Sequence, residues 1–176
     1  MTTDNKLMKK ALHQAQQAFS SGEFPVGCVL AHHGQVLTTG SRTGTAAGSA
    51  NEVDHAEMVA LRRLSALNGN INPAEISLYC TMEPCLMCFS AIMLAGIGRV
   101  VFAYEDVMGG GTGIDRSALA PLYRDRTVRV VPNVMRDESL RLFQAFFKNP
   151  DNDYWRGSLL AEYTLSQSLQ APESAM

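Results

Sequence analysis

The stretch LYCTMEPCLMC at residues 78–88 decides the fold, because a strand runs directly into a helix start there. The apolar run over residues 76–82 predicts the strand, and Pro84 is expected in the first turn of a helix that continues to about residue 95. Cys85 and Cys88 are three residues apart and therefore share one face of that helix. The positive end of a helix dipole favours thiolate over thiol, and a thiolate is what a metal ligand requires.

On both sides of this segment the chain alternates helices and strands. The pattern before it predicts a helix over 4–20, strands over 24–31 and 35–39, a glycine-rich loop over 40–53 and a helix over 55–67. The pattern after it predicts a strand over 99–104, a loop over 105–126 with a short helical turn, a strand over 128–131, and helices over 137–147 and 154–168. The expected fold class is α/β, with helices on both faces of one mixed sheet.

Composition limits the kinds of protein that this chain can be. Its 176 residues match one domain, and 46% hydrophobic residues with only 18% charged residues argue against disorder. The formal net charge of −2 argues against nucleic-acid binding through bulk charge. The N-terminus has no apolar signal core, and the longest nearly apolar stretch, residues 86–97, is too short for a membrane span of about 20 residues. We therefore expect a cytoplasmic protein with no membrane partner and with reduced cysteines.

A second segment, His55-Ala56-Glu57, also lies at an expected helix start, with 26 residues between Glu57 and Pro84. Two thiolates and one imidazole would make a three-ligand zinc site with a fourth position open for water, which is the catalytic pattern. Glu57 is the candidate base for that water. Each signal alone has another explanation: Glu57 could cap its helix together with Asp54, and a single Cys-x-x-Cys could be a redox pair. The combination favours zinc, and leaves Cys28 and Cys80 as core residues of strands.

The pattern His-x-Glu followed by Pro-Cys-x-x-Cys is the signature of zinc nucleobase deaminases. Together with GEFPVGCVL at 22–30, HAEMVALR at 55–62 and IGRVVFAYED at 97–106, it resembles the zinc-dependent cytidine/deoxycytidylate deaminase superfamily. Within it, the chain is most similar to the group of nucleoside, guanine and tRNA adenosine deaminases. The resemblance covers about residues 6–147.

The resemblance implies a cytidine deaminase-like fold, a three-layer α/β/α sandwich with a five-stranded mixed sheet. It implies one Zn²⁺ per chain, held by His55, Cys85 and Cys88, and a homodimer. It also implies that zinc-bound hydroxide attacks an amidine carbon, while Glu57 shuttles protons and ammonia is released. We expect residues 1–148 to form the deaminase domain and 149–176 a helical extension packed on it.

The substrate is less well defined than the chemistry. We expect substrate contacts from residues beside the two motifs and the first strand: Phe24, Val26, Arg42, Ala56, Met82, Glu83 and Pro84. Arg42 stands where tRNA-acting relatives usually carry a base-holding asparagine, and Asn51 is the alternative candidate for that role. Tyr154 and Trp155 either stack on a base or pack in the core.

Three hypotheses follow. The favoured one is deamination of a free nucleobase or nucleoside, and the second is a tRNA adenosine deaminase. The third is a catalytically silent, zinc-stabilised partner subunit, against which the presence of Glu57 argues. Residues 116–141 carry six arginines and three acidic residues, which would suit RNA, whereas residues 151–176 carry one arginine and four acidic residues.

Overall fold

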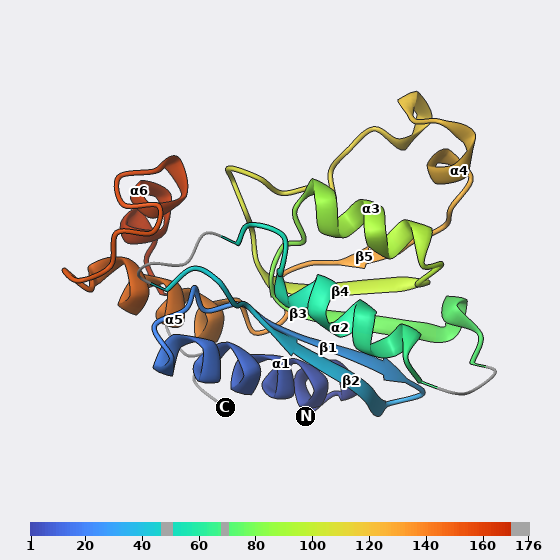
Figure 1. The fold of residues 1–176 in the computed structure, drawn as a ribbon, viewed down its shortest axis with the longest axis horizontal. Helices are drawn as coiled ribbons and strands as arrows, with labels where there is room; N and C mark the ends of the chain where they lie inside the picture. The colour runs from blue at the N-terminus through green and yellow to red at the C-terminus, as the bar shows by residue number, and fades with distance from the viewer. Residues whose placement is uncertain (47–50, 68–70, 170–176) are drawn as a thin grey trace, which may run out of the picture.

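The computed structural model describes residues 1–46, 51–67 and 71–169 (Figure 1). Its elements in chain order are α1 (Thr3–Ser20), β1 (Gly27–His32), β2 (Gln35–Ser41), α2 (Ala56–Ser65), the 3₁₀ turn η1 (Pro73–Glu75), β3 (Ile76–Met82), α3 (Leu86–Leu94), β4 (Arg99–Tyr104), the 3₁₀ turn η2 (Arg116–Ala118), α4 (Pro121–Arg124), β5 (Arg129–Val131), α5 (Arg136–Lys148) and α6 (Leu159–Ser166).

The five strands form one mixed sheet in the order β2-β1-β3-β4-β5. β1 pairs antiparallel with both β2 and β3, whereas β3, β4 and β5 run parallel to one another. The five-stranded mixed sheet is therefore confirmed, and β1 lies inside it between β2 and β3. The carboxyl ends of parallel strands share one edge of a sheet, which is where open α/β folds bind ligands.

Helices cover both faces of the sheet, which confirms the α/β/α arrangement (Figure 1). α1 lies on one face with α5 beside it, and α2 and α3 lie on the other. Val29 and Tyr79 point into the core under α1, while their neighbours Cys28 and Cys80 point into the core under α2 and α3. Both cysteines are free and fully buried, as predicted.

Two glycines allow helices to lie directly on strands. A Cβ atom at Gly27 would come within 2.2 Å of the Ala11 carbonyl oxygen in α1, and one at Gly40 within 2.1 Å of the Ala56 carbonyl oxygen in α2. Real side-chain atoms do not approach backbone so closely, so both positions require glycine. Gly40 thereby fixes the first turn of α2, immediately after His55.

Several predicted boundaries are wrong near the site. β1 begins at Gly27 rather than at residue 24, because Pro25 has no N–H and the Phe24 N–H bonds the Thr45 hydroxyl at 2.7 Å. Pro84 lies before the helix rather than in its first turn, because Cys85 is the N-cap of α3. β2 continues to residue 41, into the predicted loop.

The last helix starts five residues later than predicted. Ser158 caps α6 by accepting a hydrogen bond from the Ala161 N–H at 3.2 Å, so Tyr154 and Trp155 lie in the turns before it. The backbone at Trp155 has φ 55° and that at Gly157 has φ 69°, and this left-handed conformation interrupts a helix. Along the described residues, no helix is long and apolar enough to span a membrane.

Candidate active site

His55, Cys85 and Cys88 come together at the starts of α2 and α3. His55 and Cys85 are the N-caps of the two helices, and neither uses its side chain to cap. The Nδ1 atom of His55 lies 3.5 Å from each of the two sulfur atoms. Ordinary Zn–S and Zn–N bond lengths in a tetrahedral site predict a sulfur–nitrogen separation of about 3.5 Å. The three donors, whose ligand atoms lie within 4.8 Å of one another, therefore fit a zinc ion.

The electrostatics of the cluster favour one thiolate before any metal binds. A hydrogen bond from Cys88, followed by one from His55, lowers the pKa of Cys85 to about 4. The Cys88 thiol keeps its proton, because donation to Cys85 and burial both raise its pKa. A divalent cation would displace that proton, since zinc binds cysteine as thiolate.

Glu57 is buried in the first turn of α2, two residues after His55. Its Oε2 atom is buried and has no hydrogen-bond partner among the residues that the structure describes. Burial raises the pKa of this carboxyl group above its ordinary value. A buried polar atom without a partner is costly and calls for an explanation such as an ordered water or a ligand. Glu57 is thus placed to exchange a proton with a molecule bound at the cluster.

A cavity of about 260 Å³ opens in front of the cluster. Its lining includes five of the seven expected substrate contacts, namely Phe24, Val26, Arg42, Met82 and Glu83, together with His55, Glu57 and Cys85. The other two, Ala56 and Pro84, are buried beside the cluster without lining the cavity. Asn51 is not in the lining either, because its amide group binds the Asp54 carboxylate and the N–H groups of Val53 and Asp54.

Arg42 is only 2% exposed, and its guanidinium group organises the neighbouring loop. One terminal nitrogen donates to the carbonyl oxygens of Thr43, Asn51 and Asp54 at 2.6, 2.8 and 3.2 Å. The other donates to the Glu52 carboxylate at 3.0 Å. Both terminal nitrogens are therefore occupied within the protein, and the side chain forms part of the cavity wall.

Sequence reasoning missed the contribution of the loop after β4, which lines the cavity through Asp106, Met108 and Gly109. The Asp106 carboxylate accepts hydrogen bonds from the N–H groups of Met108 and Gly109 at 3.0 and 2.9 Å. Burial raises its pKa above the ordinary value. One signal could have found it: Asp106 follows the carboxyl end of a parallel strand, where α/β folds place their ligands.

Aromatic rings close the side of the cavity that faces the C-terminal segment. The Phe24 ring lies 5.2 to 5.9 Å from five others, those of Phe143, Phe146, Phe147, Tyr154 and Trp155. Tyr154 and Trp155 stack at 4.9 Å between ring centroids, with 17° between their planes. The Tyr154 hydroxyl donates to the Glu52 carboxylate at 2.9 Å, which ties this turn to the loop that Arg42 organises. The position of the pair is therefore compatible with both expected roles, packing in the core and stacking on a base bound in the cavity.

An open three-donor zinc site beside a buried glutamate, at the carboxyl ends of parallel strands, is typical of zinc-dependent hydrolytic deaminases. The family model of the cytidine and deoxycytidylate deaminase zinc-binding region matches residues 1–104. The chain belongs to this family, and it is a hydrolytic deaminase that uses zinc. This membership favours the two enzyme hypotheses over the silent subunit.

The relatives share most of the chain. The tRNA-specific adenosine deaminase of Bacillus subtilis is 30% identical over 148 residues, covering 84% of this chain and 91% of the relative. A solved structure from a study of A-to-I editing by tRNA:A34 deaminases at the wobble position has a TM-score of 0.64 at 29% identity, covering 78% of this chain and 98% of that one. The guanine deaminase of Nitrosomonas europaea has a TM-score of 0.62 at 17% identity over 81% of this chain and 83% of that one, which supports the fold.

Proposed function

We propose that this deaminase acts on a free nucleobase or nucleoside, with His55, Cys85 and Cys88 as zinc ligands and Glu57 as the proton-transfer residue. The observation that carries the proposal is that Glu57, whose Oε2 atom has no hydrogen-bond partner within the described parts of the chain, lines a small, partly aromatic cavity. A planar base fits such a cavity, and its amidine carbon would lie against the ligand cluster.

The reaction that this site supports replaces an exocyclic amine by a carbonyl oxygen. Zinc, when bound, acts as a Lewis acid that lowers the pKa of water. Glu57 Oε2 takes one proton from the attacking water and passes it to the ring nitrogen, then takes the remaining proton of the new hydroxyl group and passes it to the leaving amine. One C–O bond forms, one C–N bond breaks, and one water is consumed for each ammonia released. Because burial disfavours the charged form of Glu57, its pKa is raised and its carboxylate is a stronger base toward the attacking water.

The enclosure of the cavity supports a small substrate. Its volume of about 260 Å³ lies near the lower end of the range usual for small-molecule sites. Tyr154 and Trp155 form one wall, and Trp155 holds a left-handed backbone conformation that is rare for a bulky residue. Backbone strain of this kind clusters at functional sites. We assign these two residues to the binding of the base.

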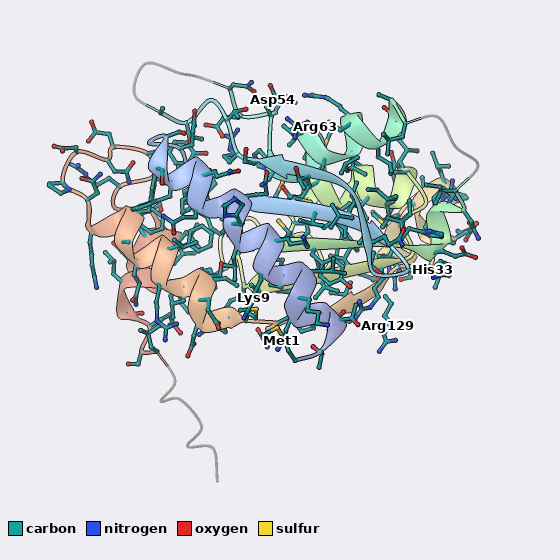
Figure 2. All side chains as sticks on the ribbon, turned by 90° about the horizontal axis from the view of Figure 1, so that it is seen from below. Met1, Lys9, His33, Asp54, Arg63 and Arg129 are labelled. Atoms are coloured by element: carbon teal, nitrogen blue, oxygen red, sulfur yellow. The ribbon has the colours of Figure 1, made fainter. Side chains whose placement is uncertain are left out.

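Charge placement supports the same substrate class. Arg99 and Arg129 are the first residues of β4 and β5, so they lie at the sheet edge opposite the carboxyl ends where the cavity opens. Figure 2 shows Arg129 far from Asp54, the residue preceding His55. Arg136 is occupied by an ion pair with Glu105. The charged residues among those that line the cavity are Arg42, Glu57, Glu83 and Asp106, so acidic groups prevail there.

A tRNA adenosine deaminase is the second candidate, and the 30% identity with the Bacillus subtilis enzyme over most of both chains favours it. This function would need a cationic surface next to the cavity to bind phosphates, and the affinity would fall steeply with salt.

The test is ammonia release from adenine, guanine, cytosine, their nucleosides, and tRNA with adenosine in the anticodon, using protein with measured zinc content. We expect turnover of at least one small molecule. Its kcat/KM should change by less than about twofold between 50 and 200 mM salt, because binding without phosphate contacts depends little on salt. Activity on tRNA alone would refute the small-molecule assignment. Glu57→Gln should retain zinc and lose activity by at least about a hundredfold. Parent-like activity in that variant would refute the role of Glu57.

We also propose that the chain forms a homodimer through the outer face of α3. Leu86 and Leu94 are each 52% exposed on this helix, and Leu122 of α4 is exposed to the same extent. α4 contacts α3, so these side chains belong to one side of the molecule. Light scattering should give twice the chain mass of 19.2 kDa, and Leu94→Glu should shift the protein toward monomer. A monomeric parent protein would contradict the proposal.

A further inference from the structure

Two histidines and one glutamate gather at the far end of β1, away from the active site. His32 is the last residue of β1, His33 follows it in the β1–β2 turn, and Glu75 ends η1 just before β3. Their ligand atoms lie within 4.8 Å of one another. We propose that these three residues form a second metal site, which binds a divalent transition-metal ion such as Zn²⁺ and is separate from the catalytic chemistry.

The distances suit such an ion. The Glu75 Oε2 atom lies 3.0 Å from the Nε2 atom of His32 and 3.5 Å from the Nε2 atom of His33. Ordinary Zn–N and Zn–O bond lengths predict separations of about 3.4 Å in a tetrahedral site. The two observed distances bracket this value, so an ion could bind all three atoms with only small side-chain adjustments. Imidazole and carboxylate are also ligands that zinc prefers.

The backbone holds the three ligands in place without a metal. His32 pairs with Ile76 in the ladder between β1 and β3, and Ile76 directly follows Glu75. The sheet therefore fixes the β1–β2 turn beside the start of β3. The other oxygen of Glu75, Oε1, accepts a hydrogen bond from the Asn72 side-chain amide at 3.4 Å. The hydrogen bond to Oε1 orients the carboxylate so that Oε2 faces the histidines. Metal-binding carboxylates are commonly oriented by such hydrogen bonds.

One carboxylate oxygen serves both histidines, because Glu75 Oε2 lies within ion-pair distance of His32 and of His33. His33 has φ 47° and Gly34 has φ 81°, as a two-residue hairpin turn between β1 and β2 requires, and this turn positions the His33 side chain. In this conformation its ring lies 4.0 Å from that of His32, and both Nε2 atoms converge on one carboxylate oxygen. Two imidazoles and one carboxylate that converge in this way offer three ligand atoms to one metal ion. A single imidazole beside the carboxylate would offer only a hydrogen bond.

The site is distant from the catalytic cluster and open to solvent. β1 has six residues, so the site lies about 20 Å along the strand from Val26, which lines the cavity. Figure 2 shows His33 at an extreme end of the molecule. The His33 side chain is 72% exposed and that of Glu75 48%, so water can complete the coordination. A bound ion would join the β1–β2 turn to the segment entering β3 and would stabilise the folded state by mass action.

The test uses protein already loaded with one zinc per chain, titrated with Zn²⁺ by calorimetry. We expect a second equivalent to bind, and His33→Asn and Glu75→Gln each to weaken it at least tenfold. Asparagine is chosen because it tolerates the left-handed backbone of the turn. His13→Asn, which removes an exposed histidine from α1, is the matched control and should leave the second equivalent unchanged.

Thermal unfolding provides an independent measurement. Excess Zn²⁺ should raise the unfolding midpoint of the parent protein and of His13→Asn, and should raise it less in His33→Asn. The proposal is wrong if the loaded protein takes up no second equivalent. It is equally wrong if His33→Asn and Glu75→Gln both bind that equivalent with the parent affinity.

Discussion

Replacing Arg42 by alanine should destabilise the fold far more than the loss of a typical arginine. Three backbone carbonyl oxygens, those of Thr43, Asn51 and Asp54, accept hydrogen bonds from its guanidinium group and would lose this donor. Losing a hydrogen bond of this kind costs about 1 kcal/mol, so the three together predict a loss of roughly 3 kcal/mol in the free energy of unfolding. The ion pair with Glu52 adds little, because the Glu52 side chain is 60% exposed.

The assay is urea unfolding followed by circular dichroism. With a slope of about 2 kcal/mol per molar urea, a loss of 3 kcal/mol lowers the midpoint by about 1.5 M. Arg63→Ala is the matched control, because exposed Arg63 also donates to a backbone carbonyl, that of Thr39 at 2.8 Å. This control should cost no more than about 1 kcal/mol.

Two outcomes would refute this reasoning about Arg42. One is an Arg42→Ala protein whose stability matches that of Arg63→Ala. The other is full stability in Arg42→Lys, because a lysine ammonium cannot reproduce the planar fork that reaches separate acceptors. We further expect Arg42→Ala to lower the zinc content, since the loop that it organises leads directly into His55.

Three further predictions concern stability. Gly40→Ala should cost about 2–3 kcal/mol and displace α2, because the new Cβ atom would meet the Ala56 carbonyl oxygen at 2.1 Å; thermal unfolding and zinc content measure both effects. Tyr104→Phe should cost about 1 kcal/mol in urea unfolding, because its hydroxyl bonds a buried threonine hydroxyl of α6 at 3.0 Å. The Arg99 guanidinium lowers the pKa of Asp4 below its ordinary 3.8. The resulting stabilisation is complete above pH 3.8 and is lost as the pH falls through the lower folded-state value. The stability gap between the parent and Asp4→Asn should therefore be constant from pH 7 to pH 5 and shrink below pH 3.8 in acid titrations.

The strands and most helices could be predicted because the spacing of apolar residues along the sequence shows which side of each element is buried. Runs such as residues 76–82 are apolar enough to be strands in any context, and the helix over residues 3–20 has a clear apolar face. The helix predicted over 154–168 shows where this logic fails. Tyr154 and Trp155 fit the helical spacing of the apolar residues that follow them. The helix nevertheless begins only after Gly157, which has a left-handed backbone, and Ser158, which caps it.

The ligand cluster could be predicted because its chemistry depends on residue type and short spacing. His55 and Glu57 are two residues apart, Cys85 and Cys88 are three, and each pair lies at the start of one helix. The rest of the cavity could not be predicted in the same way. Its walls combine segments more than 100 residues apart, such as Phe24 and Trp155, and only the packing of the sheet brings them together.

Strand direction connects the fold to the choice of substrate. The sequence shows an arginine-rich stretch without showing which side of the sheet it occupies. In the structure Arg99 and Arg129 begin parallel strands, whereas Glu83 and Asp106 follow the ends of such strands. Parallel strands have all their carboxyl ends at one edge of the sheet. The two arginines are therefore separated from the two carboxylates by the length of a strand. Glu83 and Asp106 both line the cavity, and this placement of negative charge supports the proposal that the ligand is a neutral base rather than a phosphate.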